Sequence, residues 1–297
     1  MKFTSITQLV ELAESQNKKI SEIMIETEME IHNRSKEDIV EQMRNSLYVM
    51  RDAIAKGLTE EIKSRSGLSG GDGKKLAQYL ANGHYLSGST ILEAVSKSVA
   101  TSEVNASMGT IVATPTAGSV GILPGTIFAS AKNLHSSEEE MVHALFTAGA
   151  IGLVIANNAF ISGAAGGCQA EVGSATAMAA AAVVEMAGGT PTQSANALAI
   201  ALKNMLGLTC DPVAGLVEVP CVKRNAMGAA NAMIAADMAL AGIQSVIPPD
   251  EVIETMYRIG CTMPMPLKET ALGGLAATPT ARKFEVEIFG APLHKKK

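Results

Sequence analysis

The sequence predicts a mainly α fold, with a large helical body behind a short N-terminal helical segment and few or no strands. Three observations predict it. Apolar residues repeat every three or four positions over long stretches, as on one face of a helix. Alternation of apolar and polar residues, which indicates strands, is scarce. Aromatic residues make up 3% of the 297 residues and Trp is absent, so the core must be built from Ala, Leu, Ile, Val and Met, several of which are good helix formers.

The first long helix is expected to begin after Ser35. The Ser35 hydroxyl can cap the helix, and Asp38 places a carboxylate three residues later. Apolar residues then recur at helical spacing and form one face of about seven turns. These residues are Ile39, Met43, Leu47, Met50, Ile54, Leu58 and Ile62.

Later helices are expected where similar start and stop signals occur. Ser137 precedes three glutamates, which favour the positive end of the helix dipole. Residues 190–207 begin with a Thr-Pro pair, typical of a cap and a first-turn proline. Two more helices are expected over 222–241 and 249–260, each closed by a glycine. The best short strand candidate is 110–113.

Charge and composition argue for one domain that binds no nucleic acid. The net charge of −5 speaks against a nucleic-acid binder, because phosphate recognition needs clustered Lys and Arg. No repeat and no low-complexity linker divides the chain. We therefore expect a single domain over 1–297, with 1–35 as the N-terminal helical segment and 36–297 as the helical body.

Residues 141–170 contain no Asp, Glu, Lys or Arg. A stretch of that length raises the question of a membrane span. Repeated glycines and the polar residues His143, Asn157 and Gln169 interrupt it, and flanking Lys and Arg are missing. We interpret it as a buried helix that leads into a polar loop, and we expect no membrane association.

The N-terminus lacks the continuous apolar stretch of a signal peptide. We therefore expect a cytoplasmic protein with reduced thiols. Reduced cysteines are buried small residues, catalytic groups or metal ligands. The four cysteines are Cys168, Cys210, Cys221 and Cys261.

Common cofactor motifs are absent. The glycine-rich stretch 66–75 lacks the spacing of a phosphate-binding loop, and no dinucleotide-binding fingerprint occurs. Paired C-x-x-C motifs are missing, which argues against a structural zinc site. Lys74 and Lys223 are available for a pyridoxal Schiff base, but no surrounding pattern supports either one.

Three of the cysteines lie at breaks between elements. Cys168 follows two glycines, Cys210 comes just after a helix end and Cys221 just before a helix start. Backbone N–H groups and a helix N-terminus stabilise thiolates at such places. Three soft ligands suit an iron–sulfur cluster whose remaining iron can bind and polarise a substrate. On spacing alone, buried packing residues are the alternative.

The stretch 114–125 is dense in hydroxyls and glycines and carries no charge. It is either a tight turn or a cradle in which Thr114, Thr116 and Ser119 help to bind a small anionic group such as a carboxylate.

Asn158, Arg224 and Asn225 complete the candidate substrate-binding set. Asn158 is a polar residue in the uncharged stretch, and is either a helix-end cap or a ligand contact. Arg224 can pair bidentately with a carboxylate, the alternative being an ordinary surface salt bridge. Asn225 follows it directly.

Together these motifs resemble the iron–sulfur-dependent L-serine dehydratases (L-serine ammonia-lyases), specifically the α chain of the two-subunit form. The similarity rests on T-P-T-A-G-S-x-G-x-x-P-G at 114–125 and N-A-x-I-S-G-x-x-x-G-C-Q-A-E-V-G at 158–173. It continues through C-D-P-V-A-G at 210–215, P-C-V-K-R-N-A at 220–226 and K-E-T-A-L-G-G-L-A at 268–276. The motifs follow the family's order.

The resemblance implies a [4Fe-4S] cluster held by Cys168, Cys210 and Cys221, with one iron free for substrate and no pyridoxal phosphate. The implied reaction converts L-serine to pyruvate and ammonia by β-elimination of water. A base removes the α-proton while the open iron helps the β-hydroxyl to leave. The resulting aminoacrylate becomes an imine and hydrolyses without further enzyme chemistry.

Two departures from the family pattern bear on the partner and the catalytic residues. Single-chain members end in a cysteine that can cap the open iron, whereas 277–282 contain none, and Cys261 lies outside the motif and is interpreted as a non-ligand. The family's S-H-T-x-G-P motif is also absent, and it belongs to a β chain in two-subunit members. We therefore expect a β chain as partner, in a heterodimer or a larger assembly. The catalytic residues stay unassigned, including the five histidines, His32, His84, His135, His143 and His294.

Two other functions remain open. A related cluster-dependent β-elimination, such as cysteine desulfidation, would use the same three thiolates. A non-catalytic helical subunit would use its cysteines for packing, and would be colourless and free of iron.

Overall fold

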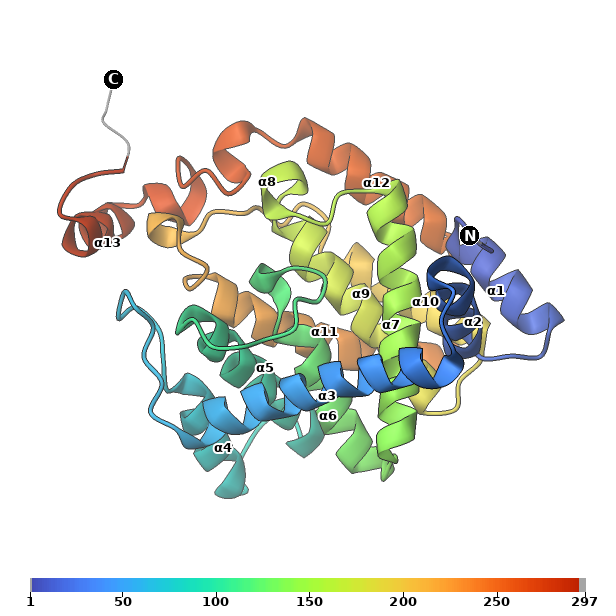
Figure 1. The fold of residues 1–297 in the computed structure, drawn as a ribbon. Coiled ribbons are helices and arrows are strands. Elements are labelled where there is room, and N and C mark those ends of the chain that lie inside the picture. Colours follow the sequence, from blue (N-terminus) through green and yellow to red (C-terminus); the bar gives the residue numbers. More distant parts are fainter. Residues whose placement is uncertain (1, 294–297) are drawn as a thin grey trace.

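The computed structural model describes residues 2–293 and folds them into thirteen α-helices joined by short 3-10 and π-helical turns (Figure 1). The predicted mainly α fold is confirmed. In chain order the helices are α1 (Ile6–Ser15), α2 (Ile20–His32), α3 (Lys36–Thr59), α4 (Asp72–Ala81), α5 (Ser89–Ala106), α6 (Ile122–Leu134), α7 (Glu138–Asn158), α8 (Gly163–Gly166), α9 (Ser174–Met186), α10 (Pro191–Lys203), α11 (Cys221–Leu240), α12 (Pro249–Thr262) and α13 (Pro279–Phe289).

The predicted helix starts are confirmed by their caps. The hydroxyls of Ser35, Ser137 and Thr190 accept backbone N–H groups at the starts of α3, α7 and α10. The predicted end of α12 was wrong by two residues, because Gly260 lies inside the helix. A Cβ atom there would be 3.1 Å from the Cα of Gly166, so this glycine lets α8 approach α12 closely and does not end the helix. The end predicted for α10 at residue 207 was also late, since that helix stops at Lys203.

The strand suggested for 110–113 was wrong. Within the described residues, the only β pairing is a single parallel bridge between Cys210 and Lys268. Ile111 and Val112 instead pack against two different apolar clusters. Their β-branched side chains are therefore partly buried in a segment that pairs with no neighbouring strand within the described residues.

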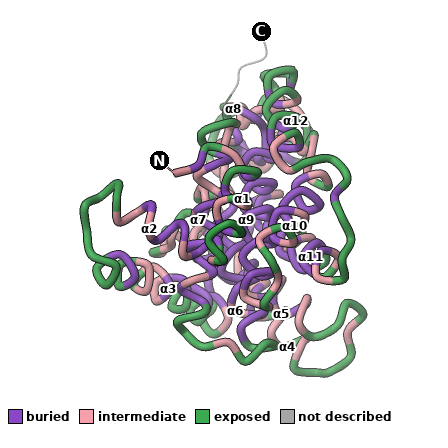
Figure 2. Tube along the Cα trace, turned by 90° about the vertical axis from the view of Figure 1, so that its right-hand side faces the viewer, coloured by how far each residue is buried: buried purple, intermediate pink, exposed green. Residues whose placement is uncertain are grey.

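Helix α9 lies at the centre of the molecule, within the buried interior in Figure 2. Every residue from Ser174 to Glu185 is buried, and α9 contacts α6, α7, α10 and α11. Its many alanines let these neighbours approach closely on all sides, as in a helix that has no solvent-facing stripe. A π-helical turn, Gln169–Gly173, leads directly into α9. Cys168 is therefore anchored to the most deeply buried helix.

Helix α7 is the only helix in the described part of the chain that is long and apolar enough to cross a membrane. Of its apolar window, 61% is buried within the protein. It packs against α2, α3 and α9, and it ends where the segment leading to α8 begins. This is the packing of a core helix.

The N-terminal helices join the same apolar core as the body. Phe3, Ile6 and Ile23 belong to the cluster that also contains the apolar residues of α7, α9 and α10. Helix α2 packs along α7, and α1 packs against α10 and α12.

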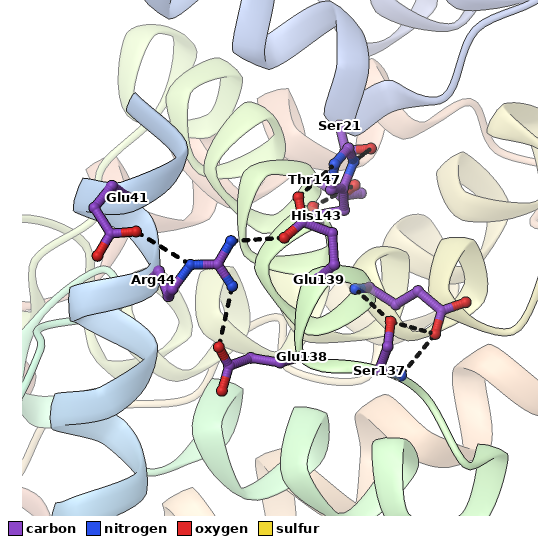
Figure 3. A network of polar contacts seen from close by, with 9 residues as sticks. Ser21, Glu41, Arg44, Ser137, Glu138, Glu139, His143 and Thr147 are labelled. Atoms are coloured by element: carbon purple, nitrogen blue, oxygen red, sulfur yellow. Dashed lines mark hydrogen bonds and ion pairs between the residues drawn. The ribbon is translucent and has the colours of Figure 1, made fainter. Parts of the chain in front are cut away.

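A polar network fixes α3 where it crosses the N-terminal half of α7 (Figures 1 and 3). The Arg44 guanidinium lies 3.0 Å from Glu138 Oε1 and 2.7 Å from Glu139 Oε2. On the α2 side of α7, Ser21 Oγ lies 3.1 Å from His143 Nδ1. These contacts hold three helices in one arrangement, although each exposed ion pair contributes little free energy by itself.

Candidate active site

The three cysteines of the predicted ligand set are buried and come from three separate elements. Cys168 precedes the π-helical turn, Cys210 lies in the loop after α10, and Cys221 is the first residue of α11. Their exposed fractions are 2%, 3% and 7%. The Cys168 and Cys210 thiols hydrogen-bond to each other. Cys221 lies close enough to Cys168 for the two sulfur atoms to interact electrostatically.

Arg224 links the elements that carry these cysteines. It lies one turn after Cys221 on α11, forms an ion pair of 2.8 Å with Asp211 Oδ1, and donates to the Thr209 carbonyl over 2.7 Å. It also hydrogen-bonds to Cys168. The Arg224 side chain is 17% exposed, so it is not the ordinary surface salt bridge considered as the alternative.

These contacts make the three thiols electrostatically unequal. The hydrogen bond from Cys210 and the charge of Arg224 lower the pKa of Cys168. The same hydrogen bond, with burial, raises the pKa of Cys210, and burial raises the pKa of Cys221. The chain alone therefore favours the thiolate form most at Cys168, and burial disfavours it at the other two cysteines.

Glu171 is a site residue that the motif analysis did not single out. It lies in the π-helical turn and is 8% exposed. The Thr116 hydroxyl donates to Glu171 Oε1 over 2.8 Å, and the Gly163 backbone N–H also donates to this carboxylate. Burial raises its pKa, and nearby Glu269 adds to the effect. The available signal was its place as the first charged residue after the uncharged stretch 141–170.

Glu269 is the second carboxylate that the sequence did not reveal. Its backbone N–H donates to the Cys210 carbonyl over 2.7 Å, next to the bridge between Cys210 and Lys268. A Cβ atom on Gly163 would lie 2.7 Å from Cys210 Sγ, 2.8 Å from Glu171 Oε2 and 3.2 Å from Glu269 Oε2. A thiol and two carboxylates thus pack against Gly163, and only glycine lets them approach this closely.

The hydroxyl-rich loop is tied to both the π-helical turn and α11. Thr116 reaches Glu171, and Ser119 Oγ donates to the Thr114 carbonyl over 3.1 Å. Asn225 accepts from the Gly121 N–H over 2.9 Å and donates to the Gly118 carbonyl over 2.8 Å. Asn225 also donates to the carbonyl of Cys221, 2.9 Å away. The described contacts of Asn225 therefore position the loop.

Thr114 is 7% exposed and its hydroxyl has no hydrogen-bond partner within residues 2–293.

Asn158 has different partners from the other predicted site residues. It is exposed at the end of α7, and its amide donates to the carbonyls of Thr4 and Val154 over 2.9 and 2.8 Å. These bonds attach the N-terminal segment to α7. Cys261 is exposed on α12, where its thiol interacts with Tyr257. His294 lies outside the described residues.

A large cavity lies elsewhere. It measures about 550 Å³ and runs between α2, α3 and α7, where Met24, Met43 and Phe146 line it. It touches Pro115 and Ile161, next to the site loops, but none of the cysteines. The reactive side chains gather at the cysteines, so we place the candidate site there.

The donor chemistry of the cysteine site fits an iron–sulfur cluster. Three buried thiols, a guanidinium and the N-terminus of α11 are present together, and the last two favour negatively charged sulfur. Among the described residues, no group of three or more His, Cys, Asp or Glu side chains is arranged to hold one metal ion. Cluster cysteines each bind a different iron, so they need not converge on one point as the ligands of a single ion do.

A sequence model described as "Serine dehydratase alpha chain" matches residues 15–276. The chain belongs to this family. The matched part of the chain contains all three buried cysteines, Glu171 and Glu269, and stops before α13.

Two similar relatives in the family are named as alpha chains. The "Probable L-serine dehydratase, alpha chain" of Bacillus subtilis is 64% identical over 291 residues, which cover 98% of this chain and 97% of the relative. The "L-serine dehydratase, alpha chain" of Peptoniphilus asaccharolyticus is 41% identical over 282 residues, covering 95% and 97%. An L-serine dehydratase of Escherichia coli is 37% identical over 280 residues, which cover 92% of this chain but only 61% of that longer protein.

Proposed function

We propose that this chain is the catalytic alpha subunit of an L-serine dehydratase, and that Cys168, Cys210 and Cys221 hold its [4Fe-4S] cluster. One observation carries the proposal: three buried cysteines from separate elements meet around Arg224 in a member of the serine dehydratase alpha chain family. The names of the relatives support L-serine as the substrate.

The proposed reaction balances without an external oxidant or reductant. L-serine loses its α-proton and its β-hydroxyl as water and becomes 2-aminoacrylate. This tautomerises to an imine, which water hydrolyses to pyruvate and ammonia. When bound, the cluster would supply an open Lewis-acidic iron that polarises the leaving hydroxyl.

The residues of this chain prepare the site in two ways. Arg224 and the N–H groups at the start of α11 offset the negative charge of the thiolates. Asn225 holds the loop that carries Thr114, Thr116 and Ser119, and the hydroxyl and N–H donors of that loop suit the substrate carboxylate.

We also propose a β chain as partner and the cytoplasm as the compartment. The alpha-chain names of the relatives support a partner subunit. The L-serine dehydratase of Escherichia coli supports it too, because this chain matches only 61% of its length. A reducing compartment keeps the three thiols able to bind iron.

The test is anaerobic iron and sulfide analysis, with a visible spectrum, of the wild type and of Cys168→Ala, Cys210→Ala and Cys221→Ala. We expect about four irons and four sulfides per chain in the wild type, and loss of the cluster absorbance in each variant. Cys261→Ala is the control and should keep the cluster.

Activity is then measured with the β chain present. Pyruvate formed from L-serine supports the proposal, and sulfide formed from L-cysteine in its place would point to desulfidation. A wild-type complex that stays colourless and free of iron would identify the cysteines as packing residues and end the dehydratase proposal.

A further inference from the structure

Two carboxylates face the cysteine site from opposite segments. Glu171 comes from the π-helical turn before α9, and Glu269 comes from the loop after α12. Glu171 Oε2 and Glu269 Oε2 lie 2.8 Å and 3.2 Å from the position of a Cβ on Gly163, and Cys210 Sγ lies 2.7 Å from it. Gly118 lies against another side of Glu171, where a Cβ would be 2.9 Å from Oε2, so glycines on two segments let the chain approach this carboxylate closely.

Neither carboxylate has a cationic partner among the described residues. Glu171 accepts only from the Thr116 hydroxyl and the Gly163 N–H. Arg224, the guanidinium in this region, is engaged by Asp211, by the Thr209 carbonyl and by Cys168. Glu171 is buried and Glu269 is half-buried. Carboxylates withdrawn from water without a counter-charge are costly. This neighbouring pair therefore calls for a positive charge that the described residues do not supply.

The chemistry of the surroundings favours an ammonium group over a metal ion. No set of three or more ligand side chains within residues 2–293 is arranged around one ion. Thr116 donates to Glu171 and belongs to the loop proposed to bind the substrate carboxylate. A 2-amino acid carries an ammonium and a carboxylate on the same carbon, so one molecule can meet both groups.

We propose that Glu171 and Glu269 bind the α-ammonium group of the substrate and make the site selective for 2-amino acids over 2-hydroxy acids. This inference rests on the function proposed above. A 2-hydroxy acid of the same shape brings no positive charge and leaves both carboxylates uncompensated, which is how a site rejects a close analogue.

The test compares L-alanine with L-lactate as competitive inhibitors of L-serine turnover by the cluster-loaded complex with the β chain. The two molecules differ only in an ammonium or a hydroxyl on the α-carbon. In Glu171→Gln and Glu269→Gln we expect the inhibition constant of L-alanine to rise about 10- to 100-fold, as for loss of a charge-assisted hydrogen bond. The constant for L-lactate should stay the same or fall.

Glu185→Gln is the matched control. Glu185 is also buried, and it also accepts backbone N–H groups and a threonine hydroxyl, but it lies at the end of α9 that is remote from Cys168. It should keep the wild-type preference for L-alanine. Equal changes in both inhibition constants, or no change in either, would overturn the proposal.

Two further measurements keep the result decisive. Calorimetric titration of L-alanine and L-lactate into the anaerobic complex gives the ratio of their dissociation constants without turnover. Measuring the iron content identifies any variant that has lost the cluster. If Glu171→Gln does not fold, the comparison is made with Glu269→Gln alone. A wild-type complex that forms no pyruvate overturns the proposed function. Only this inference is overturned if the complex forms pyruvate but its variants keep the wild-type ratio of the inhibition constants for L-alanine and L-lactate.

Discussion

Arg224 brings a permanent positive charge among buried thiols. Its guanidinium contacts Asp211 and the Thr209 carbonyl on the Cys210 segment, and it also reaches Cys168. A planar guanidinium can satisfy several acceptors in fixed directions, which a lysine ammonium cannot do. One residue thus supplies the counter-charge and the geometry for elements that are far apart in sequence.

Replacing Asn225 tests how firmly the hydroxyl-rich loop is held. Asn225→Ala removes three hydrogen bonds, of which those to Gly121 and Cys221 are buried and that to Gly118 is partly buried. We expect the free energy of unfolding to fall by about 2–4 kcal/mol, because buried partners are left unpaired. Urea denaturation measures it. The control, Asn158→Ala, removes two bonds at an exposed site and should cost about 1 kcal/mol. Equal losses of unfolding free energy in the two variants would contradict the role of Asn225 in positioning the loop.

Replacing Gly163 tests the close packing of the Cys210 thiol and the two carboxylates against this position. In Gly163→Ala the new methyl would lie 2.7 Å from Cys210 Sγ, so the neighbouring groups must move. We expect L-serine turnover to fall at least about 100-fold, because small displacements at reacting groups are costly. A steady-state assay measures it. Gly149→Ala on α7 meets nothing within 4 Å and should stabilise the protein by up to about 1 kcal/mol. Full activity in Gly163→Ala would be incompatible with the site described.

Several helices are capped by carboxylates from other elements. Asp250 of α12 accepts the N–H groups of Ile6 and Thr7 at the start of α1, over 2.7 and 2.9 Å. Glu185 of α9 does the same for α2, and Glu103 of α5 for α4. The residues directly before α2 and α4, Lys19 and Gly71, lack a capping hydroxyl or carboxylate. These contacts both complete the helix starts and dock the helices.

Removing the buried cap of α2 should loosen that helix first. In Glu185→Ala the Ile20 and Ser21 N–H groups and the Thr147 hydroxyl lose their acceptor. We expect a loss of about 2–4 kcal/mol and faster amide hydrogen exchange at the start of α2. Asp250→Ala, at a partly exposed cap, should cost only about 1 kcal/mol. A uniform rise in exchange across all helices would argue against a local capping role.

The α5–α6 pair should lose stability in acid through Glu93. Burial alone would raise the pKa of Glu93, but hydrogen bonds from Lys97 (2.7 Å) and Lys132 (3.0 Å) outweigh it and lower the pKa below its ordinary value of 4.5. A lowered folded-state pKa gives stability that is fully present above 4.5 and is lost as the pH falls through the folded value.

Glu93→Gln should therefore be less stable than the wild type at pH 7, by about 1 kcal/mol. The difference should shrink as the pH falls below 4.5 and the Glu93 carboxylate takes up a proton. Urea midpoints of the two proteins, measured at pH 7 and at a series of acidic pH values, test it. A difference that does not change with pH would show that packing, and not charge, accounts for the effect.

On the scale of the whole molecule, most of the apolar core lies in helices outside the cysteine site. The core is formed by α7, α9 and α10 with parts of α1, α2 and α3. Cys168 and Cys210 also belong to this core, whereas Cys221 and Glu269 do not. We expect air to destroy the proposed cluster and the activity while the helices stay folded.

Absorbance near 400 nm and circular dichroism, recorded together during aeration, test this expectation. The absorbance and the L-serine turnover should fall in parallel, with the helical signal almost unchanged. Loss of helicity at the same rate would mean that the cluster supports the whole fold, as metal does in small metal-dependent domains.

The sequence by itself determined the helical class and the starts of several helices, and it indicated which cysteines to examine. Ser35, Ser137 and Thr190 act on N–H groups within the next few residues, so their capping role is a local property. The helix ends at 207 and 260 were misjudged, because a glycine marks either a stop or a close approach, and only the neighbouring helix shows which.

Only the tertiary structure decided how the site is assembled. Glu171 and Glu269 are about a hundred residues apart in sequence, and their sequence positions do not indicate that the two pair. They become a pair only where the turn before α9 and the loop after α12 meet beside Cys210. The carboxylates that cap α1, α2 and α4 follow the same rule. Charge and hydrogen bonding act through space, and the packing of the helices fixes which groups lie within reach.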